Sequence, residues 1–446
     1  MHLGPADDRA WLVGLLIVVA LGAAAPGAAQ PPPAPGQPGP AREAPAPGQV
    51  LSLPEAIALA RRQHPTIRAA EQAVTASTAR VPQAQSAYYP RLDWLSAAAR
   101  SQFFSSTLNQ GVRANSISTA LQANLLIYDF GKTGALVDEA RANVRVSETD
   151  LERIRELVVL NVRQAYLVLL QSRRLVRVAD AGLARAELNL RSAQGFFDVG
   201  TKPKSDVTKA EVEVANARVT VIRARNQVRL AETTLANALG LEATTTVEIQ
   251  DILGFEPVTL DAAGLLTEAL KNRPELIQAL ARFDAARAQL AGARARFWPT
   301  LNAAGFYGYS TPDDPPLHEN WSIGIQLSWN LFEGFFTVTR IRETQALVEV
   351  ARANYDAFEL QVRLEVEQAY ISVVEAAERV AATEKAVESA TENLRLAQGR
   401  YDAGVGTILD LTDAQLALTT AEADQVRALT DHKLGLAALD RAVGRP

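Results

Sequence analysis

The sequence of 446 residues contains no cysteine, one methionine and only four histidines. Without cysteine the chain can form no disulfide, so a fold outside the cytoplasm has to be stabilised by packing alone. No thiol is present to carry a lipid anchor. The histidines are too scattered along the chain to predict a metal site, and we expect no metal and no cofactor. They are His2, His64, His318 and His432.

The sequence also lacks an excess of basic charge and the common catalytic motifs. Its formal net charge is −5, which gives no reason to expect a nucleic-acid partner. We find no Gly-x-x-x-x-Gly-Lys-Ser/Thr loop, no His-Glu-x-x-His pair and no nucleophile elbow. The protein is therefore predicted not to be an enzyme.

Only one long apolar run is present, from Trp11 to Ala25. It is short for a transmembrane helix and is followed by small residues, which is typical of a secretory signal peptide over residues 1–29. The stretch from Pro26 to Pro47 holds nine of the 22 prolines. Because such a stretch buries too little apolar surface to fold, we expect a disordered spacer over residues 30–50.

Proline is absent, and glycine nearly absent, from two stretches of about 64 residues that are rich in helix-forming residues. A continuous helix of that length measures roughly 95 Å at about 1.5 Å per residue, which no ordinary globular core requires. Gly200 and Gly404 follow the two stretches and indicate helix ends. We predict long helices over 132–195 and 336–399, which return as shorter helices over 205–239 and 407–443.

Within each long helix every seventh residue is large and apolar, and a small residue follows three positions later. A seven-residue repeat predicts a left-handed coiled coil, and the small residues allow close approach of a partner helix. The alternative is an ordinary amphipathic helix of a bundle, with a period of 3.6 residues. The large positions are Val162, Leu169, Val176, Leu183, Leu190 and Phe197, and Val366, Val373, Val380, Val387, Leu394 and Tyr401. The small positions are Ala165, Ser172, Ala179, Ala186 and Ala193, and Ala369, Ala376, Thr383, Ala390 and Ala397.

The segments that precede the long helices alternate instead between apolar and polar residues, from 117 to 128 and from 321 to 331. Period two predicts strands with one apolar face, and the length and the aromatic residues near the ends suit transmembrane strands. With partner strands at 91–104 and 300–310, two hairpins result, over about 91–128 and 300–331, with loops near 109–111 and 312–316. The alternative is a pair of hairpins in a soluble periplasmic sheet. The aromatic anchors in these strands are Trp94, Tyr128, Trp321 and Trp329.

Four strands per chain cannot close a barrel. In lipid, each unpaired backbone group at a strand edge costs several kcal/mol. If these strands cross a membrane, several chains must therefore share one barrel. Two chains would give eight strands and a filled interior, whereas three would give twelve and could leave a lumen.

The chain is internally duplicated. His64-Pro65 recurs as Arg273-Pro274 (274 − 65 = 209), and Gln164-Ala165-Tyr166 recurs as Gln368-Ala369-Tyr370 (368 − 164 = 204). The offset changes between these pairs, where we place the hairpin whose loop tolerates a change of length. We predict two copies of one helix–hairpin–helix unit, over 51–240 and 261–444, with an irregular connector over 241–260.

In these features the region from Leu51 to Gly444 resembles the TolC-like outer-membrane efflux proteins. The resemblance rests on the duplicated architecture and on motifs that stand in register in both copies. These are Leu-Ile-Tyr-Asp-Phe-Gly (126–131) and Asn-Leu-Phe-Glu-Gly (330–334) where the strands end, and Phe-x-x-Gly-x-x-x-x-x-Asp (197–206) and Tyr-x-x-Gly-x-x-x-x-x-Asp (401–410) at the helical turns.

The resemblance implies a mostly α-helical protomer that contributes four strands to a twelve-stranded barrel in the outer membrane, as a homotrimer. The helices would continue this barrel as a coiled-coil α-barrel across the periplasm. A periplasmic adaptor (membrane fusion) protein and an inner-membrane efflux pump or ABC exporter would dock at the helical turns. Tyr89-Pro90 and Trp298-Pro299 would mark the passage from helix to membrane, with Tyr89 and Trp298 as further interface aromatics. The function so implied is a passive exit duct for efflux or type I secretion.

The resemblance also assigns roles at the helical turns. Asp410 and Asp413 match an acidic constriction ring, Asp206 an acidic position of the first copy, and Tyr401 a constriction tyrosine. A basic residue of that network falls on Gly406, so its ionic contact is missing or is rebuilt with Lys202 or Lys204. The turns where the adaptor would dock comprise Val199, Gly200, Thr201, Gly404, Val405 and Gly406.

Two alternatives stay open. Asp206 and Asp410 stand in the first turn of a predicted helix, where a carboxylate stabilises the helix dipole without any role in a channel. Thr407 with Asp410 also has the spacing of a capping arrangement. For the whole chain, the alternative function is that of a periplasmic coiled-coil structural or adaptor protein without a pore.

Overall fold

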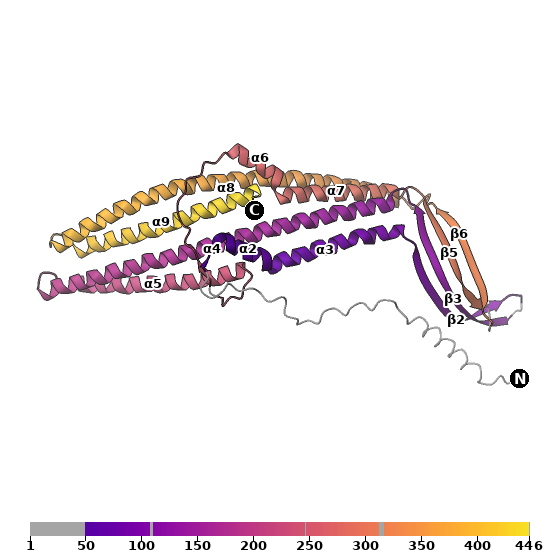
Figure 1. The fold of residues 1–446 in the computed structure, drawn as a ribbon, viewed down its shortest axis with the longest axis horizontal. Coiled ribbons are helices and arrows are strands. Elements are labelled where there is room, and N and C mark those ends of the chain that lie inside the picture. The colour runs from indigo at the N-terminus through magenta and orange to yellow at the C-terminus, as the bar shows by residue number, and fades with distance from the viewer. Residues whose placement is uncertain (1–49, 108–109, 246, 312–315, 446) are drawn as a thin grey trace, which may run out of the picture. The chain divides into compact units, whose positions relative to one another are not determined.

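The computed structural model describes residues 50–107, 110–245, 247–311 and 316–445 (Figure 1). They form two compact units, the first with residues 76–144 and 282–351, and the second with the remaining described residues. The predicted signal peptide and residues 30–49 of the predicted spacer lie outside the described residues, as do 108–109 and 312–315 of the predicted loops. Val50 is the first residue of strand β1, although the sequence predicts that it belongs to the spacer.

The first unit contains an antiparallel sheet of four strands in the order β2-β3-β5-β6. The strands are β2 (Arg91–Ser105), β3 (Gln110–Tyr128), β5 (Thr300–Thr311) and β6 (His318–Ser328). They occupy the segments where alternation predicts them, with two differences at the ends. Gln110 and Gly111 begin β3 instead of belonging to the loop, and β6 ends at Ser328, so that Trp329 to Leu331 lie beyond the strand.

The strand register separates the two faces of this sheet. Trp94 pairs with Leu121, Leu121 with Tyr307, and Tyr307 with Trp321, which makes a row of large apolar side chains across all four strands. One residue further along each strand, the row of Asp93, Gln122, Phe306 and Ser322 belongs to the other face. Because side chains alternate along a strand, the first face is mainly apolar and the second mainly polar.

A register shift between Leu126 and Tyr128 interrupts the pairing of β3 with β5. Leu126 pairs with Asn302 on the polar face, and Tyr128 pairs with Leu301, which in turn pairs with Leu327 on the apolar face. A one-residue irregularity of this kind moves the following side chain to the other side of the sheet. Tyr128, which strict alternation places on the polar face, therefore belongs to the apolar one.

An acidic side chain supports the start of each long helix. The carboxylate of Asp129 accepts hydrogen bonds from the backbone N–H groups of Gly131 (3.2 Å) and Thr133 (2.7 Å), which α4 would otherwise leave unpaired. In the second copy Glu333 accepts from the hydroxyl of Thr337 at 2.8 Å. These carboxylates explain why the motifs at 126–131 and 330–334 contain Asp and Glu.

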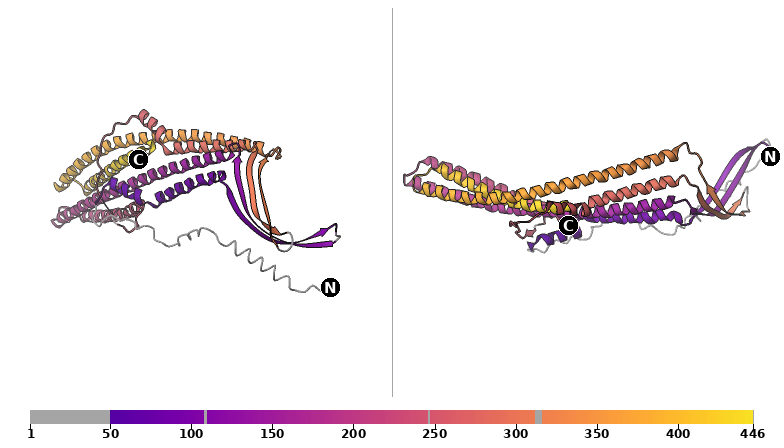
Figure 2. Two further views of the ribbon diagram at one scale, coloured as in Figure 1. Left: turned by 45° about the vertical axis from the view of Figure 1, so that its right-hand side comes forward. Right: turned by 90° about the horizontal axis from the view of Figure 1, so that it is seen from above.

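Two long helical hairpins lie side by side, and most of their length belongs to the second unit, because only residues 132–144 and 336–351 of the long helices fall in the first unit (Figure 2). In the first hairpin, α4 (Lys132–Asp198) turns back into α5 (Lys204–Ala238), and in the second, α8 (Phe336–Asp402) turns back into α9 (Ile408–Val443). The four helices begin within a residue of the predicted positions, and the long ones continue three residues further. No described helix carries an apolar stretch of the length that a membrane crossing requires.

Shorter helices accompany the hairpins, and proline sets their boundaries. α2 (Leu53–Gln63) ends at His64 before α3 (Pro65–Gln85), and α6 (Ala262–Asn272) ends at Arg273 before α7 (Pro274–Ala295). His64 and Arg273 have nearly the same extended backbone, with ψ angles of 125° and 121°. A residue before proline avoids the helical region, so the repeated X-Pro pair breaks the helix at the same place in both copies.

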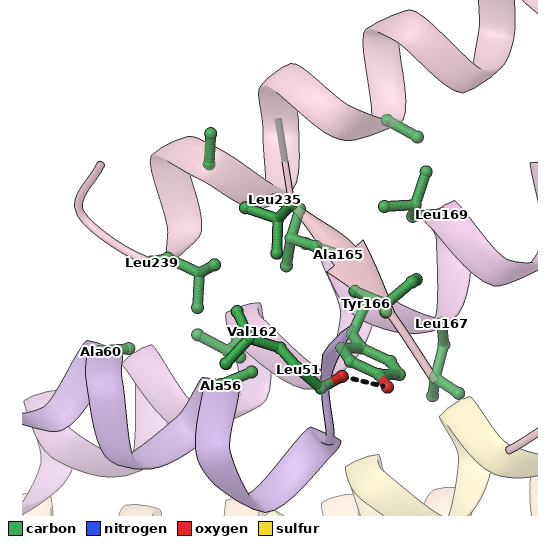
Figure 3. Close-up of a cluster of buried hydrophobic side chains, with 14 of the residues drawn as sticks. Leu51, Ala56, Ala60, Val162, Ala165, Tyr166, Leu167, Leu169, Leu235 and Leu239 are labelled. Carbon is green, nitrogen blue, oxygen red and sulfur yellow. Dashed lines mark hydrogen bonds between the residues drawn. The ribbon is translucent and has the colours of Figure 1, made fainter. Parts of the chain in front are cut away.

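Tyr166 stands at the centre of the larger core of the second unit (Figure 3). Its ring is completely buried, and its hydroxyl group lies within donating distance of the carbonyl oxygens of Leu51 (3.0 Å) and Gln250 (2.8 Å). Those two segments form a small parallel sheet of β1 (Val50–Leu51) and β4 (Glu248–Ile249). The connector, predicted to be irregular, therefore contains one strand.

The predicted seam of α4 is buried mainly at its small positions. Ala165, Ser172, Ala179, Ala186 and Ala193 are all at most 6% exposed. In α8 the large positions Val366, Val373 and Val380 are buried, and Tyr401 closes this row at 0% exposure. One assignment was wrong. Phe197 is 42% exposed, and its neighbour Phe196 packs inward instead.

Candidate functional site

The turns of the two hairpins have the same backbone geometry. Gly200 and Gly404 both have φ of +78°, a left-handed conformation that L side chains rarely adopt. Their N–H groups donate to the carbonyls of Phe197 (2.9 Å) and Tyr401 (3.0 Å), which otherwise lack a partner at the helix end. Glycine is needed at both places because the chain reverses there within a few residues.

Tyr401 lies at the centre of a small core between the turns. Its ring meets that of Phe196 edge-on at 5.7 Å and packs with Ile408 and Leu411. Burial raises the pKa of its hydroxyl group, and the nearby carboxylate of Asp206 raises it further. Tyr401 therefore remains neutral, and in the single chain it supports the turns from within.

Lys202 connects the two hairpins. Its ammonium group donates a hydrogen bond to the carbonyl of Gly406 at 3.1 Å and lies 4.9 Å from the centre of the Tyr401 ring. A Cβ atom at Gly406 would stand 2.9 Å from the backbone nitrogen of Tyr401, so this backbone has no room for a side chain there. Lys202 of the first hairpin therefore places an ammonium group beside Gly406, the position at which the resemblance expects a basic residue, whereas Lys204 is exposed.

The acidic residues of the turns have different surroundings. Asp206 is 9% exposed, in the first turn of α5. Asp410 is exposed and forms a capping box with Thr407, whose hydroxyl accepts from the Asp410 N–H at 3.1 Å. The Asp410 carboxylate in turn interacts with the Thr407 hydroxyl and accepts a hydrogen bond from the Thr407 backbone N–H at 3.3 Å, and these contacts hold the pKa of the Asp410 carboxyl below its usual value. Capping of α9 is therefore a structural role that Asp410 has in addition to any role in a channel.

Asp413 lies one turn further along α9 and is exposed. It borders a groove of about 510 Å³ between α8 and α9. The groove has an apolar floor of alanine and leucine side chains and a second acidic group, Asp424. Its lining residues are Thr383, Ala386, Asp413, Leu416, Ala417, Thr420, Ala421 and Asp424.

The turn residues expected to meet a partner are not all accessible. Val199 and Val405 are 71% and 73% exposed, which is unusual for valine. Thr201 is exposed too, although its hydroxyl donates to the Phe196 carbonyl at 2.9 Å. Gly406, in contrast, is buried. The surface that a partner could contact is therefore built around the two valines.

The expected interface aromatics of the first unit all have exposed rings, between 52% and 70% of their surface. Phe130 stacks on Trp298 at 5.4 Å and meets Tyr128 edge-on at 4.7 Å. The indole N–H of Trp329 donates to the Phe297 carbonyl. The exposed anchors are Tyr89, Trp94, Tyr128, Trp298, Trp321 and Trp329, and sequence reasoning missed Phe130, Phe297, Phe332, Phe335 and Phe336, which lie in loops or at helix ends without a strand period.

No group of three or more acidic, histidine or cysteine side chains is placed to hold a metal ion anywhere in the described ranges. The structure shows two candidate sites of another kind. One is the pair of helical turns that Lys202 links in the second unit, and the other is the apolar, aromatic face of the sheet in the first unit.

Comparison with known proteins identifies the family. The profile of the outer membrane efflux proteins matches residues 56–241 and 265–445, so the chain belongs to this family. The chain is an outer-membrane channel protein of the efflux type, with its helical part in the periplasm. These matches support the channel function and not the alternative of a pore-less coiled coil.

Individual relatives are distant but cover most of the chain. The pyoverdine export outer membrane protein OpmQ of Pseudomonas putida is 26% identical over 88% of this chain and 85% of its own length. The outer membrane protein TolC of Escherichia coli is 22% identical over 75% of this chain and 70% of its own. Among solved structures, the outer-membrane channel OprN superposes with a TM-score of 0.79 at 21% identity, over 88% of this chain and 90% of that one.

Proposed function

We propose that this protein is the passive exit duct of a tripartite efflux or type I secretion system, and that three copies share one barrel of twelve strands (three times four). The observation that carries the proposal is the sheet of the first unit. It has an apolar face crossed by the row Trp94, Leu121, Tyr307 and Trp321, and among the described strands none pairs with the outer edges of β2 and β6.

Those two edges fit each other. In the order β2-β3-β5-β6 every neighbour is antiparallel, so β2 and β6 run in opposite directions. The β6 edge of one copy can therefore pair with the β2 edge of the next in the same antiparallel manner. Closure of the ring satisfies the backbone groups that would otherwise face lipid at several kcal/mol each.

The apolar face also has a suitable extent. From Leu301 to Tyr307 the strand β5 takes six residue steps, about 20 Å at roughly 3.3 Å per residue. Aromatic side chains mark both ends of this stretch, with Tyr128 beside Leu301 and Trp321 beside Tyr307. A run of alternating apolar residues bounded by aromatic side chains is typical of an outer-membrane strand, with the lipid as a further partner.

At the helical end we propose a constriction. In a threefold ring Asp410 and Asp413 would contribute six carboxylates (three times two) around one opening, which favours cations. Asp206, Tyr401 and Lys202 would set its width, because they connect the turns from inside.

We further propose that a periplasmic adaptor docks on the turns around Val199, Gly200, Thr201, Gly404, Val405 and Gly406, and that an inner-membrane pump or ABC exporter delivers the substrate. The exposed valines support this assignment. A duct of this kind has no catalytic step, and we assign the protein no enzymatic activity.

Planar bilayers test the proposal. Purified protein in detergent should insert and produce discrete conductance steps with a preference for cations. Bilayers that stay silent, together with a monomeric protein in detergent, would contradict it.

A further inference from the structure

A pocket of about 540 Å³ lies in the second unit where the two sequence repeats meet. Its walls are α2 and α4 of the first repeat and α9 of the second, and the connector adds Ile252. The pocket opens beside Pro54, Ala58 and Arg61 of α2, which are exposed. Its volume falls in the range of roughly 300–1,000 Å³ that is usual for clefts that hold small molecules. The residues of the proposed constriction and of the sheet face take no part in it.

The interior of this pocket is apolar. Nine of its thirteen lining residues have side chains without a polar atom. Val159, Leu167 and Ala437 are its most deeply buried members, at 3%, 2% and 6% exposure. Leu53 and Ile57 of α2 lie opposite and are partly buried. The pocket therefore offers a continuous apolar surface to a ligand that brings an alkyl chain.

The charged lining residues of α9 stand at the two ends of the pocket. Lys433 and Asp440 are seven residues apart (440 − 433 = 7), which corresponds to about 10 Å along the helix. Asp440 forms an ion pair with Arg163 of α4 at 2.9 Å, so these two charges compensate each other. The pocket is thus an apolar groove with a closed ion pair at one end and Lys433 at the other.

Lys433 has only a weak partner. Its side chain is 19% exposed, but its ion pair with Glu256 measures 3.9 Å, and Glu256 is 82% exposed. An ion pair of this length with a solvated carboxylate contributes little. A sheltered ammonium group interacts more strongly with an anion that approaches to hydrogen-bond distance. The whole lining holds three cationic side chains and one carboxylate, so it attracts an anion.

We propose that this pocket binds a fatty acid, with the carboxylate beside the Lys433 ammonium group and the alkyl chain along the apolar groove over Ala437. An apolar chain with one negative head matches both the interior of the pocket and its charge. Because the walls belong to both repeats, the bound fatty acid holds α2 and α9 together. It should therefore raise the melting temperature of the protein.

Equilibrium dialysis of laurate tests the proposal on the full-length protein in phosphatidylcholine nanodiscs, with empty nanodiscs as the blank. We expect saturable binding at a single site per chain. From octanoate to decanoate the affinity should rise about fourfold for each added methylene, because each one leaves water for the apolar groove. Dodecanol, which has the chain of laurate without its charge, should bind at least roughly tenfold more weakly. The absence of saturable binding above the blank would overturn the proposal.

Two variants separate the role of the Lys433 charge from that of its ion pair. Lys433→Gln should weaken the binding of laurate at least roughly tenfold and leave that of dodecanol unchanged. Glu256→Gln removes the competing carboxylate and should leave laurate binding unchanged or make it stronger. If both variants weaken laurate equally, the ion pair supports the local structure, and Lys433 does not hold a carboxylate.

A change at the opening of the pocket provides a steric test that leaves every charge in place. Ala58→Trp should block the groove and remove both the binding of laurate and the rise in melting temperature. The matched control is Ala438→Trp, because Ala438 is exposed on α9 and does not line the pocket. Equal laurate affinities in the two variants would contradict the assigned site.

A photoreactive phenylalanine derivative in place of Pro54 identifies what occupies the pocket in the cell envelope. A product that carries the added mass of one fatty acid supports the proposal. A crosslink to another protein, or to residues 30–49 of this chain, overturns it. Conduction does not depend on this pocket, so a protein that conducts in planar bilayers but binds no laurate contradicts this inference and leaves the proposed duct intact.

Discussion

At the scale of single residues, Lys202 is the only described side chain that reaches from the first turn to the backbone of the second. Its hydrogen bond to Gly406 and its position over the Tyr401 ring together contribute about 1–2 kcal/mol. The contact joins residues that are 204 positions apart in the sequence (406 − 202 = 204). The backbone at Gly406 leaves no room for a side chain, so no residue at that position could supply the cation.

Replacement of Lys202 by methionine should loosen the turns. We expect Lys202→Met to increase single-channel conductance or open probability, because the two hairpins lose their direct link. Lys204→Met is the matched control, since Lys204 is exposed and should leave the traces unchanged. Equal traces for Lys202→Met and the unaltered protein would remove Lys202 from the constriction.

The carboxylates of α9 can be tested without loss of the helix cap. Asp410→Asn with Asp413→Asn removes the charge but keeps an oxygen that can accept hydrogen bonds at Asp410. We expect the reversal potential in a salt gradient to move toward zero, because the opening loses its preference for cations. Asp138→Asn, an exposed change in the first unit, is the control. An unchanged reversal potential would leave Asp410 with capping alone.

Glu156 provides a pH test of the second unit. Two effects raise the pKa of the Glu156 carboxyl to about 7. The larger is desolvation by burial, and the second is repulsion by the carboxylate of Glu275. Between the ordinary value of 4.5 and about 7, the native state binds more protons than the unfolded state. The contribution of this group to stability therefore falls as the pH rises through that window.

Replacement of Glu156 by glutamine should therefore stabilise the protein at pH 8 by about 1–2 kcal/mol, after a discount for the partly exposed side chain, and little at pH 4. Denaturation at both pH values measures the difference. Glu148→Gln, on the exposed side of the same helix, should change stability by less than about 0.5 kcal/mol. A gain that does not depend on pH would contradict the assigned cause.

At the scale of the elements, sequence patterns predict the helices and strands to within a few residues. Alternation locates the strands because one face is apolar, and the absence of proline locates the long helices. The patterns miss the irregularity at Tyr128 and the two-residue strand β4, because neither is long enough to show a period. They also misplace Phe197, since Phe196 instead packs against the small core around Tyr401.

The same limits apply to the candidate site. The glycines of the turns are predictable because the chain must reverse there, and both adopt positive φ. The sequence leaves Lys202 and Lys204 as equal candidates for the missing cation, since both follow Gly200 by a few residues. Only the packing of one hairpin on the other distinguishes them, as only Lys202 reaches Gly406.

The small seam positions of α4 allow its partner helices to approach closely, and this can be tested by overpacking. Ala186 is 6% exposed, so Ala186→Leu should destabilise the hairpin by about 1–3 kcal/mol. Ala184→Leu adds the same side chain on the exposed side and should change stability by less than about 0.5 kcal/mol. Denaturation midpoints compare the two, and equal effects would contradict the seam assignment.

At the scale of the whole molecule, each described unit has surfaces that the chain itself leaves uncovered. The sheet has free edges at β2 and β6, and the hairpins have free apolar faces on α5 and α8. In the sheet these surfaces belong to the two edge strands, and among the helices they belong to α5 and α8. The proposed ring of identical copies would cover these surfaces, by strand pairing at the sheet edges and by packing at the helices. Assembly of the copies and conduction through the ring therefore depend on each other.

The mass of the protein released from a mild detergent tests that claim most directly. Native mass spectrometry should give three chain masses in one particle, with no population of single chains at low protein concentration. A particle with the mass of one chain would contradict the shared barrel and, with it, the exit duct.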